Sequence, residues 1–222
     1  MLHLRRPTPQ QIRDLLDSQA DLGVTDEPEL ARQAWAGLAP QGLALREYRV
    51  LLGRGAEAFA RAREAICEWR MFPRNMTIPW PERVPIAVGH DVAILCRTWG
   101  LWSILPARIV AVHEETGAQA KNNVERFGFT YGTLPAHLEC GEERFVVAWN
   151  RDTDEVWYEL AAFSRAQWWL AKFGRPFVRY QQKRFCRESL QAMVAAVAEP
   201  NAAAKLIEPQ RHRDTEKAQK GE

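Results

Sequence analysis

Residues 127–147, FGFTYGTLPAHLECGEERFVV, decide the expected fold. Two runs in which apolar residues alternate with others flank a short turn, and this pattern is typical of a β-hairpin. The turn and the start of the second run carry a cluster of charged or titratable side chains: His137, Glu139, Glu142, Glu143 and Arg144. We therefore expect the rest of the chain to pack around this hairpin, and we expect the candidate site to lie within it.

The apolar period is two over a long region on both sides of the hairpin. Six segments have the composition of strands: residues 46–52, 90–99, 107–114, 124–134, 143–150 and 155–163. Glycine or proline separates several of them, at Gly100, Pro106, Gly117 and Gly141, while residues 75–85 resemble an irregular connector because they contain three prolines. Consecutive strands joined by short turns predict an antiparallel sheet.

The N-terminal region has the signals of helices. Thr8 and Gln11 can form a capping box around Pro9, which predicts a helix over residues 9–20. A second helix is expected to begin near residue 26. We therefore interpret residues 1–44 as an N-terminal helical extension.

The main domain is expected to span residues 45–198. A helix over residues 56–70 should follow the first strand, because its apolar residues lie on one helical stripe. Ser164 is expected to cap a further helix that pauses near Gly174 and then continues to about residue 198. Residues 199–222 are polar and lack aromatic residues, so we expect a disordered tail.

The composition excludes several classes of protein. Thirty basic and 28 acidic residues give a net charge of +2, which does not favour nucleic-acid binding. The four cysteines form no C-x-x-C pair, so we expect reduced thiols and no zinc site. The sequence shows neither a signal peptide nor an apolar run of about 18 residues. These features predict a cytoplasmic protein.

The order of the expected elements indicates an α+β fold. A strand and a helix precede the antiparallel sheet, and a long helix follows it. This is the order of the helix-grip fold, in which a curved antiparallel β-sheet wraps around a long C-terminal helix and leaves a cavity between them. The order resembles the START/Bet v 1-like superfamily (SRPBCC, polyketide cyclase-like), which includes lipid carriers, polyketide cyclases and aromatase-like proteins.

Local motifs point to a narrower family. They are WRMFP at 69–73, GLW at 100–102, RFGFTYGTLPAHLECGEERF at 126–145, VWYELAAFSR at 156–165 and FVRYQQKRFCRESLQAM at 177–193. Together they resemble the uncharacterised protein family numbered 0548, a domain of unknown function, over roughly residues 45–195. The resemblance implies the helix-grip fold and no established activity.

The hairpin supports two interpretations. His137 with Glu142 or Glu143 could form an acid–base pair, because imidazole titrates near neutral pH and a carboxylate can orient it. Tyr131 and Thr133 precede the turn and could donate hydrogen bonds to a ligand. The alternative is an ordinary hairpin whose polar groups satisfy the turn. No second histidine stands at a metal-ligand spacing, so we expect no metal and no cofactor.

Aromatic residues on the expected strands could line a pocket for a small apolar or aromatic ligand. The candidates for its walls are Trp99, Trp102, Phe129, Tyr131 and Trp157. Arg97 and Arg108 lie in otherwise apolar strands, so either could anchor a carboxylate of the ligand or face solvent. The alternative for each aromatic residue is an ordinary place in the hydrophobic core.

The last helix carries a basic stripe, formed by Arg175, Arg179, Lys183 and Arg187 at every fourth position. It could contact an anionic surface, or it could simply be a solvated face.

Three hypotheses about function follow from these features. The protein binds a small apolar ligand, or it is a cyclase, hydrolase or isomerase that uses His137, or it docks an anionic partner on this stripe.

Overall fold

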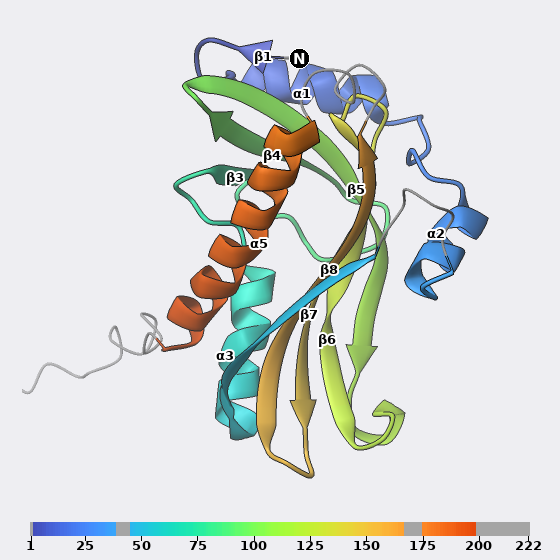
Figure 1. The fold of residues 1–222 in the computed structure, drawn as a ribbon, viewed down its shortest axis with the longest axis vertical. Coiled ribbons are helices and arrows are strands. Elements are labelled where there is room, and N and C mark those ends of the chain that lie inside the picture. The colour runs from blue at the N-terminus through green and yellow to red at the C-terminus, as the bar shows by residue number, and fades with distance from the viewer. Residues whose placement is uncertain (1, 39–44, 167–174, 199–222) are drawn as a thin grey trace, which may run out of the picture.

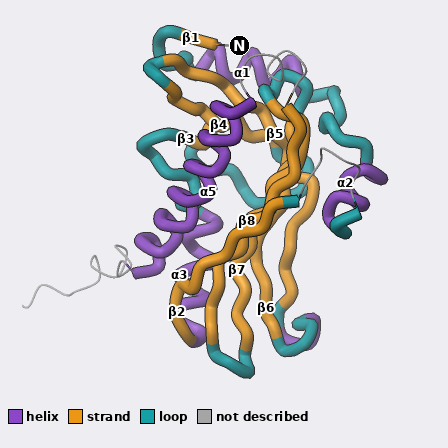
Figure 2. Tube along the Cα trace, viewed as in Figure 1, coloured by secondary structure: helices purple, strands orange, loops and turns teal. Residues whose placement is uncertain are grey.

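The structure is a computed structural model that describes residues 2–38, 45–166 and 175–198. One antiparallel sheet of eight strands dominates it, with seven in the order β2-β8-β7-β6-β5-β4-β3 and β1 paired to β5 (Figures 1 and 2). The strands are β1 (Leu2–His3), β2 (Arg46–Arg54), β3 (Thr77–Trp80), β4 (Asp91–Thr98), β5 (Leu101–Glu115), β6 (Val124–Thr133), β7 (Glu139–Asn150) and β8 (Glu155–Ala166).

The hairpin predicted at residues 127–147 is formed by β6 and β7, and β6 is the central strand of the seven-strand order. Tyr131 lies opposite Glu143, so the two side chains project from the same face. Gly128 allows a close approach of the two strands, because a Cβ there would lie 2.0 Å from the Phe145 carbonyl oxygen. The prediction of an antiparallel sheet built on this hairpin is confirmed.

Three details of the strand prediction are wrong. Gly141 does not separate strands but lies inside β7, where it pairs with Ser164 of β8. Pro106 does not separate strands but lies inside β5, where it pairs with Ala93 and its carbonyl accepts the Leu134 amide at 3.0 Å. Proline has no N–H to donate to the neighbouring strand, but the hydrogen bonds of β5 on both sides of Pro106 keep the strand continuous. The expected connector at residues 75–85 contains β3, which tolerates Pro79 because it is an edge strand.

The inner face of the sheet packs against two helices, α3 (Gly55–Cys67) and α5 (Arg175–Ala198), as Figure 1 shows. The predicted stripe of α3 is confirmed, since Phe59, Ala62 and Ile66 are buried. On α5, Cys186, Met193 and Val197 join the same core. The expected helix-grip fold, an α+β arrangement with a curved sheet against a long C-terminal helix, is thus observed.

The end of the last helix near residue 198 is confirmed by α5, but the helix start expected at Ser164 is wrong. Ser164 does not cap a helix, because β8 continues to Ala166, which pairs with Glu139 of β7. This pairing satisfies the backbone that a cap would otherwise serve. The expected pause near Gly174 falls in residues 167–174, outside the described part of the chain, as does the expected disordered tail at 199–222.

The N-terminal region covers the outer face of the sheet. Helix α1 (Pro9–Gln19) has the predicted capping box at Thr8, and its Ile12 packs against Ala93, Leu95 and Ile104. Helix α2 (Pro28–Trp35) packs through Ala31, Ala34 and Trp35 against Phe163 of β8. Helices therefore pack against both faces of the sheet, on the outer face over β4, β5 and the end of β8. No helix in the described residues is long and apolar enough to cross a membrane.

Candidate functional site

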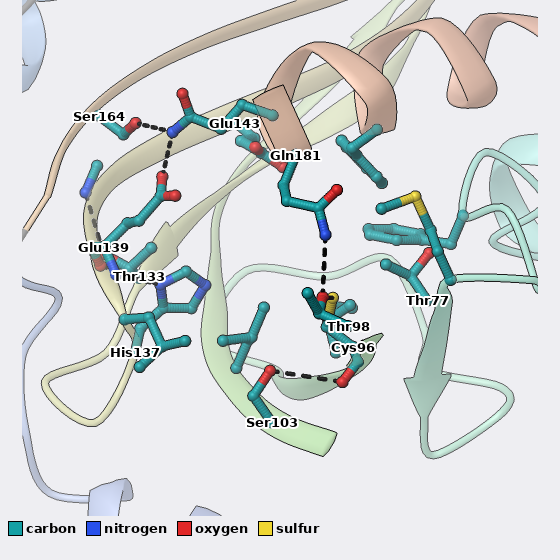
Figure 3. A pocket seen from close by; sticks show the side chains of 18 of the residues that line it. Thr77, Cys96, Thr98, Ser103, Thr133, His137, Glu139, Glu143, Ser164 and Gln181 are labelled. Carbon is teal, nitrogen blue, oxygen red and sulfur yellow. Dashed lines mark hydrogen bonds between the residues drawn. The ribbon is translucent and has the colours of Figure 1, made fainter. Parts of the chain in front are cut away.

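A cavity of about 320 Å³ lies between the inner face of the sheet and the first half of α5 (Figure 3). Apolar side chains form much of its wall: Phe72, Met76, Ile94, Leu101, Leu105 and Phe185. Polar side chains gather at the end formed by the β6–β7 hairpin. The cavity is thus amphipathic, with an apolar body and one end that carries its carboxyl groups.

The first polar pair is Tyr131 and Glu143. The Tyr131 hydroxyl donates a hydrogen bond to Glu143 Oε2 at 2.6 Å across the β6–β7 register. Burial raises the pKa of Glu143 to about 7, and nearby Glu139 adds to the shift, whereas the Tyr131 bond and Arg46 oppose it. Burial also raises the pKa of Tyr131, which keeps its proton. Glu143 can therefore gain and lose a proton near neutral pH.

Glu139 forms the second polar contact, with Gln182 of α5. Gln182 Nε2 donates to Glu139 Oε2 at 2.6 Å and to Ser164 Oγ at 3.0 Å, and its Oε1 accepts from Arg46. Burial raises the pKa of Glu139, while the bond from Gln182 lowers it. One glutamine thus connects α5 to three strands: β2, β7 and β8.

His137 lines the same end of the cavity. Its Nδ1 lies 3.0 Å from both the backbone nitrogen and the carbonyl oxygen of Glu139. Burial lowers the pKa of His137 to about 4, so the imidazole is neutral at pH 7. The expected orientation of His137 by the carboxylate of Glu142 or Glu143 is therefore wrong, since the backbone of the turn holds Nδ1 instead.

Glu142 has a different environment from its neighbours. Trp35 Nε1 on α2 donates to Glu142 Oε2 at 2.6 Å, and burial raises the pKa of Glu142. Side chains alternate along β7, so Glu142 projects toward α2 while Glu143 projects toward the cavity. Thr133 lines the cavity as expected, and its Oγ1 accepts the Gly141 amide at 3.0 Å and also bonds Thr25.

The opposite side of the cavity has polar groups that the sequence analysis did not identify. Gln181 Nε2 on α5 donates to Thr98 Oγ1 at 3.2 Å, and Ser103 Oγ donates to the Cys96 carbonyl at 3.5 Å (Figure 3). Thr98 and Cys96 share the inner face of β4 with Ile94, so strand alternation could have identified them. Nothing local in the helix sequence distinguishes Gln181 and Gln182.

Most of the predicted aromatic walls lie elsewhere. Phe129 is fully buried in the core, with its ring 4.8 Å from that of Trp69. Trp102 and Trp157 project from the outer face, where Trp102 packs near α1 and Trp157 lies under Arg49. Trp99 is 84% exposed and lines the rim of the cavity. Of the five predicted wall residues, Tyr131 and Trp99 line the cavity.

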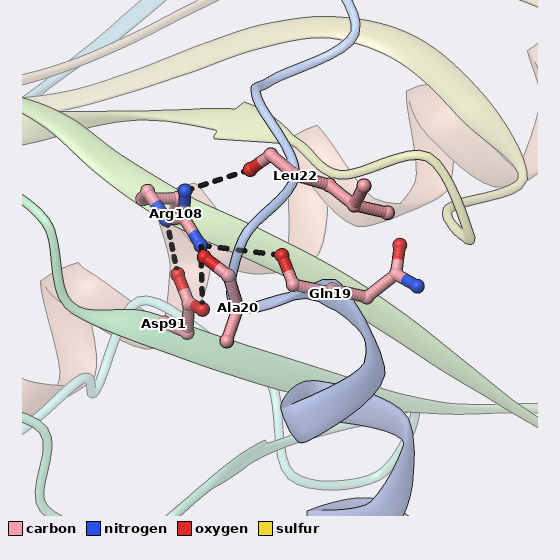
Figure 4. A network of polar contacts seen from close by, with 5 residues as sticks. All are labelled: Gln19, Ala20, Leu22, Asp91 and Arg108. Carbon is pink, nitrogen blue, oxygen red and sulfur yellow. Dashed lines mark hydrogen bonds and ion pairs between the residues drawn. The ribbon is translucent and has the colours of Figure 1, made fainter.

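The two arginines proposed as ligand anchors also face outward. Arg97 is exposed and lies 5.8 Å from the Trp102 ring. Arg108 forms a two-point ion pair with Asp91, at 2.6 and 2.9 Å, and donates to the carbonyls of Gln19, Ala20 and Leu22 (Figure 4). Arg108 therefore fixes the segment after α1 to the sheet and does not reach the cavity.

The predicted basic stripe is partly described. Arg179, Lys183 and Arg187 are exposed on α5, whereas the side chain of Arg175 lies outside the described part. Among the residues that the structure describes, no three histidine, cysteine, aspartate or glutamate side chains are grouped as a metal ion would need.

Comparisons with known proteins identify similar sequences. Residues 26–192 match the family model described as "Domain of unknown function (DUF1990)". A "UPF0548 protein" of Dictyostelium discoideum is 38% identical over 157 residues, covering 68% of this chain and 71% of the relative. A "UPF0548 protein" of Deinococcus radiodurans is 32% identical over 209 residues, covering 88% and 98%.

Solved structures give looser matches. The major latex-like protein 151 of Panax ginseng has a TM-score of 0.45 and 12% identity, covering 71% of this chain and 99% of that one. Human STARD10 has a TM-score of 0.33 and 9% identity, covering 84% and 81%. The fold described above rests on the strand order and on the packing of α5 against the sheet.

Proposed function

Because the chain belongs to the DUF1990 family, a domain of unknown function, we propose its function from the cavity: it binds a small, largely apolar or aromatic molecule between the sheet and α5. This proposal rests on one observation: a cavity of about 320 Å³ has an amphipathic lining. Binding sites of small molecules are typically concave and apolar, with a few placed polar groups. The Phe72, Ile94 and Leu105 side would hold the body of the ligand, and the hairpin end would orient it.

The rim of the cavity supports access from outside. Trp99 and Gly100 form the turn between β4 and β5, both with positive φ, and Trp99 is largely exposed. Gln181 of α5 bonds Thr98 beside this turn, so the helix and the hairpin tip meet at the rim. As part of the proposal we place the protein in the cytoplasm, because its four cysteines are free thiols.

Two measurements test this function. Native mass spectrometry of gently purified protein should show excess mass that is released on unfolding. Titration with N-phenyl-1-naphthylamine, a neutral apolar fluorophore, should give saturable fluorescence. Leu105→Trp fills the cavity and should reduce this binding at least tenfold, whereas Val88→Trp, at an exposed loop position, should not. Equal weak binding by all three proteins, with no released mass, would overturn the proposal.

A second candidate function is catalysis in the same cavity, favoured by the carboxyl of Glu143. A group whose pKa is near 7 can act as general acid or base at neutral pH. In this proposal the Tyr131 hydroxyl and the protonated carboxyl of Glu143 donate to a substrate carbonyl and polarise it, and neutral His137, held by the turn backbone, is the base of a cyclase, hydrolase or isomerase. His137→Ala and Glu143→Gln should then abolish turnover of a substrate found by extraction, while its binding remains. Unchanged turnover in both variants would exclude this role.

A third candidate is peripheral contact with an anionic surface, favoured by Arg179 and Lys183 on α5 and by exposed Trp99. Sedimentation with phosphatidylcholine vesicles that contain phosphatidylserine tests it. The wild type should co-sediment, and the charge reversals Arg179→Glu and Lys183→Glu should release it. Equal behaviour with pure phosphatidylcholine vesicles would contradict this candidate.

A further inference from the structure

The ionisable side chains of the cavity wall are of one sign. Among the described residues that line it, Glu139 and Glu143 point into the space, Glu142 turns to Trp35, and His137 is neutral at pH 7. No lysine or arginine belongs to this described lining. A ligand that reaches the polar end therefore meets carboxyl groups and neutral hydrogen-bonding groups.

The two cavity carboxyls are held by neutral donors. Tyr131 is the hydrogen-bond donor to Glu143, and Gln182 is the donor to Glu139. Among the described residues, Arg46 is a cation that lowers the pKa of both carboxyls, but its hydrogen bond goes to the amide of Gln182 and to neither carboxylate. Buried carboxylates are ordinarily paired with an opposite charge. Among the described residues, Glu139 and Glu143 thus receive hydrogen bonds from neutral groups and form no ion pair.

We infer that the ligand has an apolar body and a basic nitrogen, and that its ammonium group binds beside Glu143 and Glu139. This inference rests on the proposed binding function. An ammonium group donates hydrogen bonds to both carboxylates and gains Coulomb energy in a site of low dielectric. A ligand with a carboxylate would instead meet two acids and no lysine or arginine of the described lining, so fatty acids and aromatic acids are the disfavoured class.

The binding of such an amine is coupled to pH. Glu143 faces Tyr131 of β6, Glu139 of β7, Arg46 of β2, Tyr158 of β8 and Cys186 of α5. Because the pKa of Glu143 is raised to about 7, an ammonium ligand must bind the deprotonated form of this carboxyl. Affinity should therefore rise as pH increases from 6 to 8, by up to roughly tenfold per unit below the pKa.

The experiment compares three ligands with one skeleton: 3-phenylpropylamine, 3-phenylpropanol and 3-phenylpropionate. Each is titrated against the complex with N-phenyl-1-naphthylamine at pH 6 and pH 8. We expect the amine to compete at least tenfold better than the acid at pH 8, with the alcohol between them. The advantage of the amine should shrink at pH 6.

Variants assign the effect to the cavity. In the double variant Glu139→Gln/Glu143→Gln, the ratio of amine affinity to acid affinity should fall at least tenfold, while the affinity for the alcohol should stay the same. Glu159→Gln is the matched control, because Glu159 carries the same charge on β8 and alternates with the core residues Tyr158 and Leu160. This control should behave as wild type.

The outcomes separate the two proposals. If the fluorophore fails to bind, the binding function fails and the ligand class fails with it. If the fluorophore binds and the acid competes as well as the amine, the binding function stands and the inference of a basic nitrogen is overturned. A preference for the amine that survives in the double variant also overturns it.

Discussion

Two charged clusters, one on each face of the sheet, differ in how their charges are paired. On the outer face, Arg108 meets Asp91 in a two-point ion pair and donates to three backbone carbonyls, so charge and hydrogen-bonding capacity are matched (Figure 4). On the inner face, Glu143 and Glu139 accept hydrogen bonds from the neutral groups of Tyr131 and Gln182. In the outer cluster the arginine and the aspartate form an ion pair. In the inner cluster the two carboxyls form no ion pair within the described residues.

This difference indicates what each cluster does. Arg108 joins the end of α1 to the sheet, and its partners are all fixed parts of the chain. The cavity carboxyls instead have raised pKa values because burial penalises their charged form. A satisfied ion pair contributes to the fold, whereas an acid held in a cavity by neutral donors lowers stability when it ionises and favours a cationic ligand.

The largest expected effect concerns the outer cluster. Arg108→Ala removes the partner of Asp91 and the donor to Gln19, Ala20 and Leu22, so it should lower the free energy of unfolding by about 3 kcal/mol. Urea unfolding measures this loss. Arg97→Ala is the control, because Arg97 is exposed beside Trp102, and it should cost about 0.5 kcal/mol or less. Equal losses in the two variants would contradict the structural role of Arg108.

Much of the fold could be predicted from the sequence, because its signals are local. Strand alternation and the order of elements identified the sheet and the long helix, and the hairpin placed Tyr131 close to Glu143. The predictions were wrong where a single residue is typical of two different local structures. Pro106 resembled a strand end and Ser164 a helix cap, yet continuous pairing on β5 and β8 outweighed both.

The candidate site could be predicted only in part. Alternation assigns residues to two faces but does not say which face is inside, and α1 and α2 make the outer face apolar as well. Trp102 and Trp157 were therefore placed on the wrong face. Gln182 is far from the hairpin in sequence and meets Glu139 only through the packing of α5, which no local pattern encodes.

An effect of intermediate size concerns the pH dependence of stability that Glu143 causes on the inner face. The folded-state pKa of Glu143, about 7, lies above its ordinary value of 4.5, so the native state retains a proton that the unfolded chain has released. The stability that the carboxyl has at pH 5 is therefore lost as pH rises through 7. Glu143→Gln removes this loss, so the variant should be more stable than wild type by about 2 kcal/mol at pH 8 and similar at pH 5.

Urea unfolding of both proteins at the two pH values measures this difference. His137 acts in another window, because its lowered pKa of about 4 costs stability as pH falls below 6.5. That contribution is present in both proteins and cancels when they are subtracted. Glu159→Gln should show no such pH-dependent gain. A Glu143→Gln variant that is less stable than wild type at pH 8 would show that the carboxylate is already matched.

The smallest expected effect concerns the neutral donor itself. Tyr131→Phe removes the hydroxyl that donates to Glu143 Oε2 at 2.6 Å, and it should lower the free energy of unfolding by about 1 kcal/mol at pH 8. The same bond lowers the pKa of Glu143, so its loss should raise that pKa further, which an NMR titration of the carboxyl carbon can follow. Tyr180→Phe, at a 60% exposed position on α5, is the control. If the pKa of Glu143 stayed the same without the hydroxyl, the hydrogen bond would have no part in setting it, and Tyr131 would only fill space beside the acid.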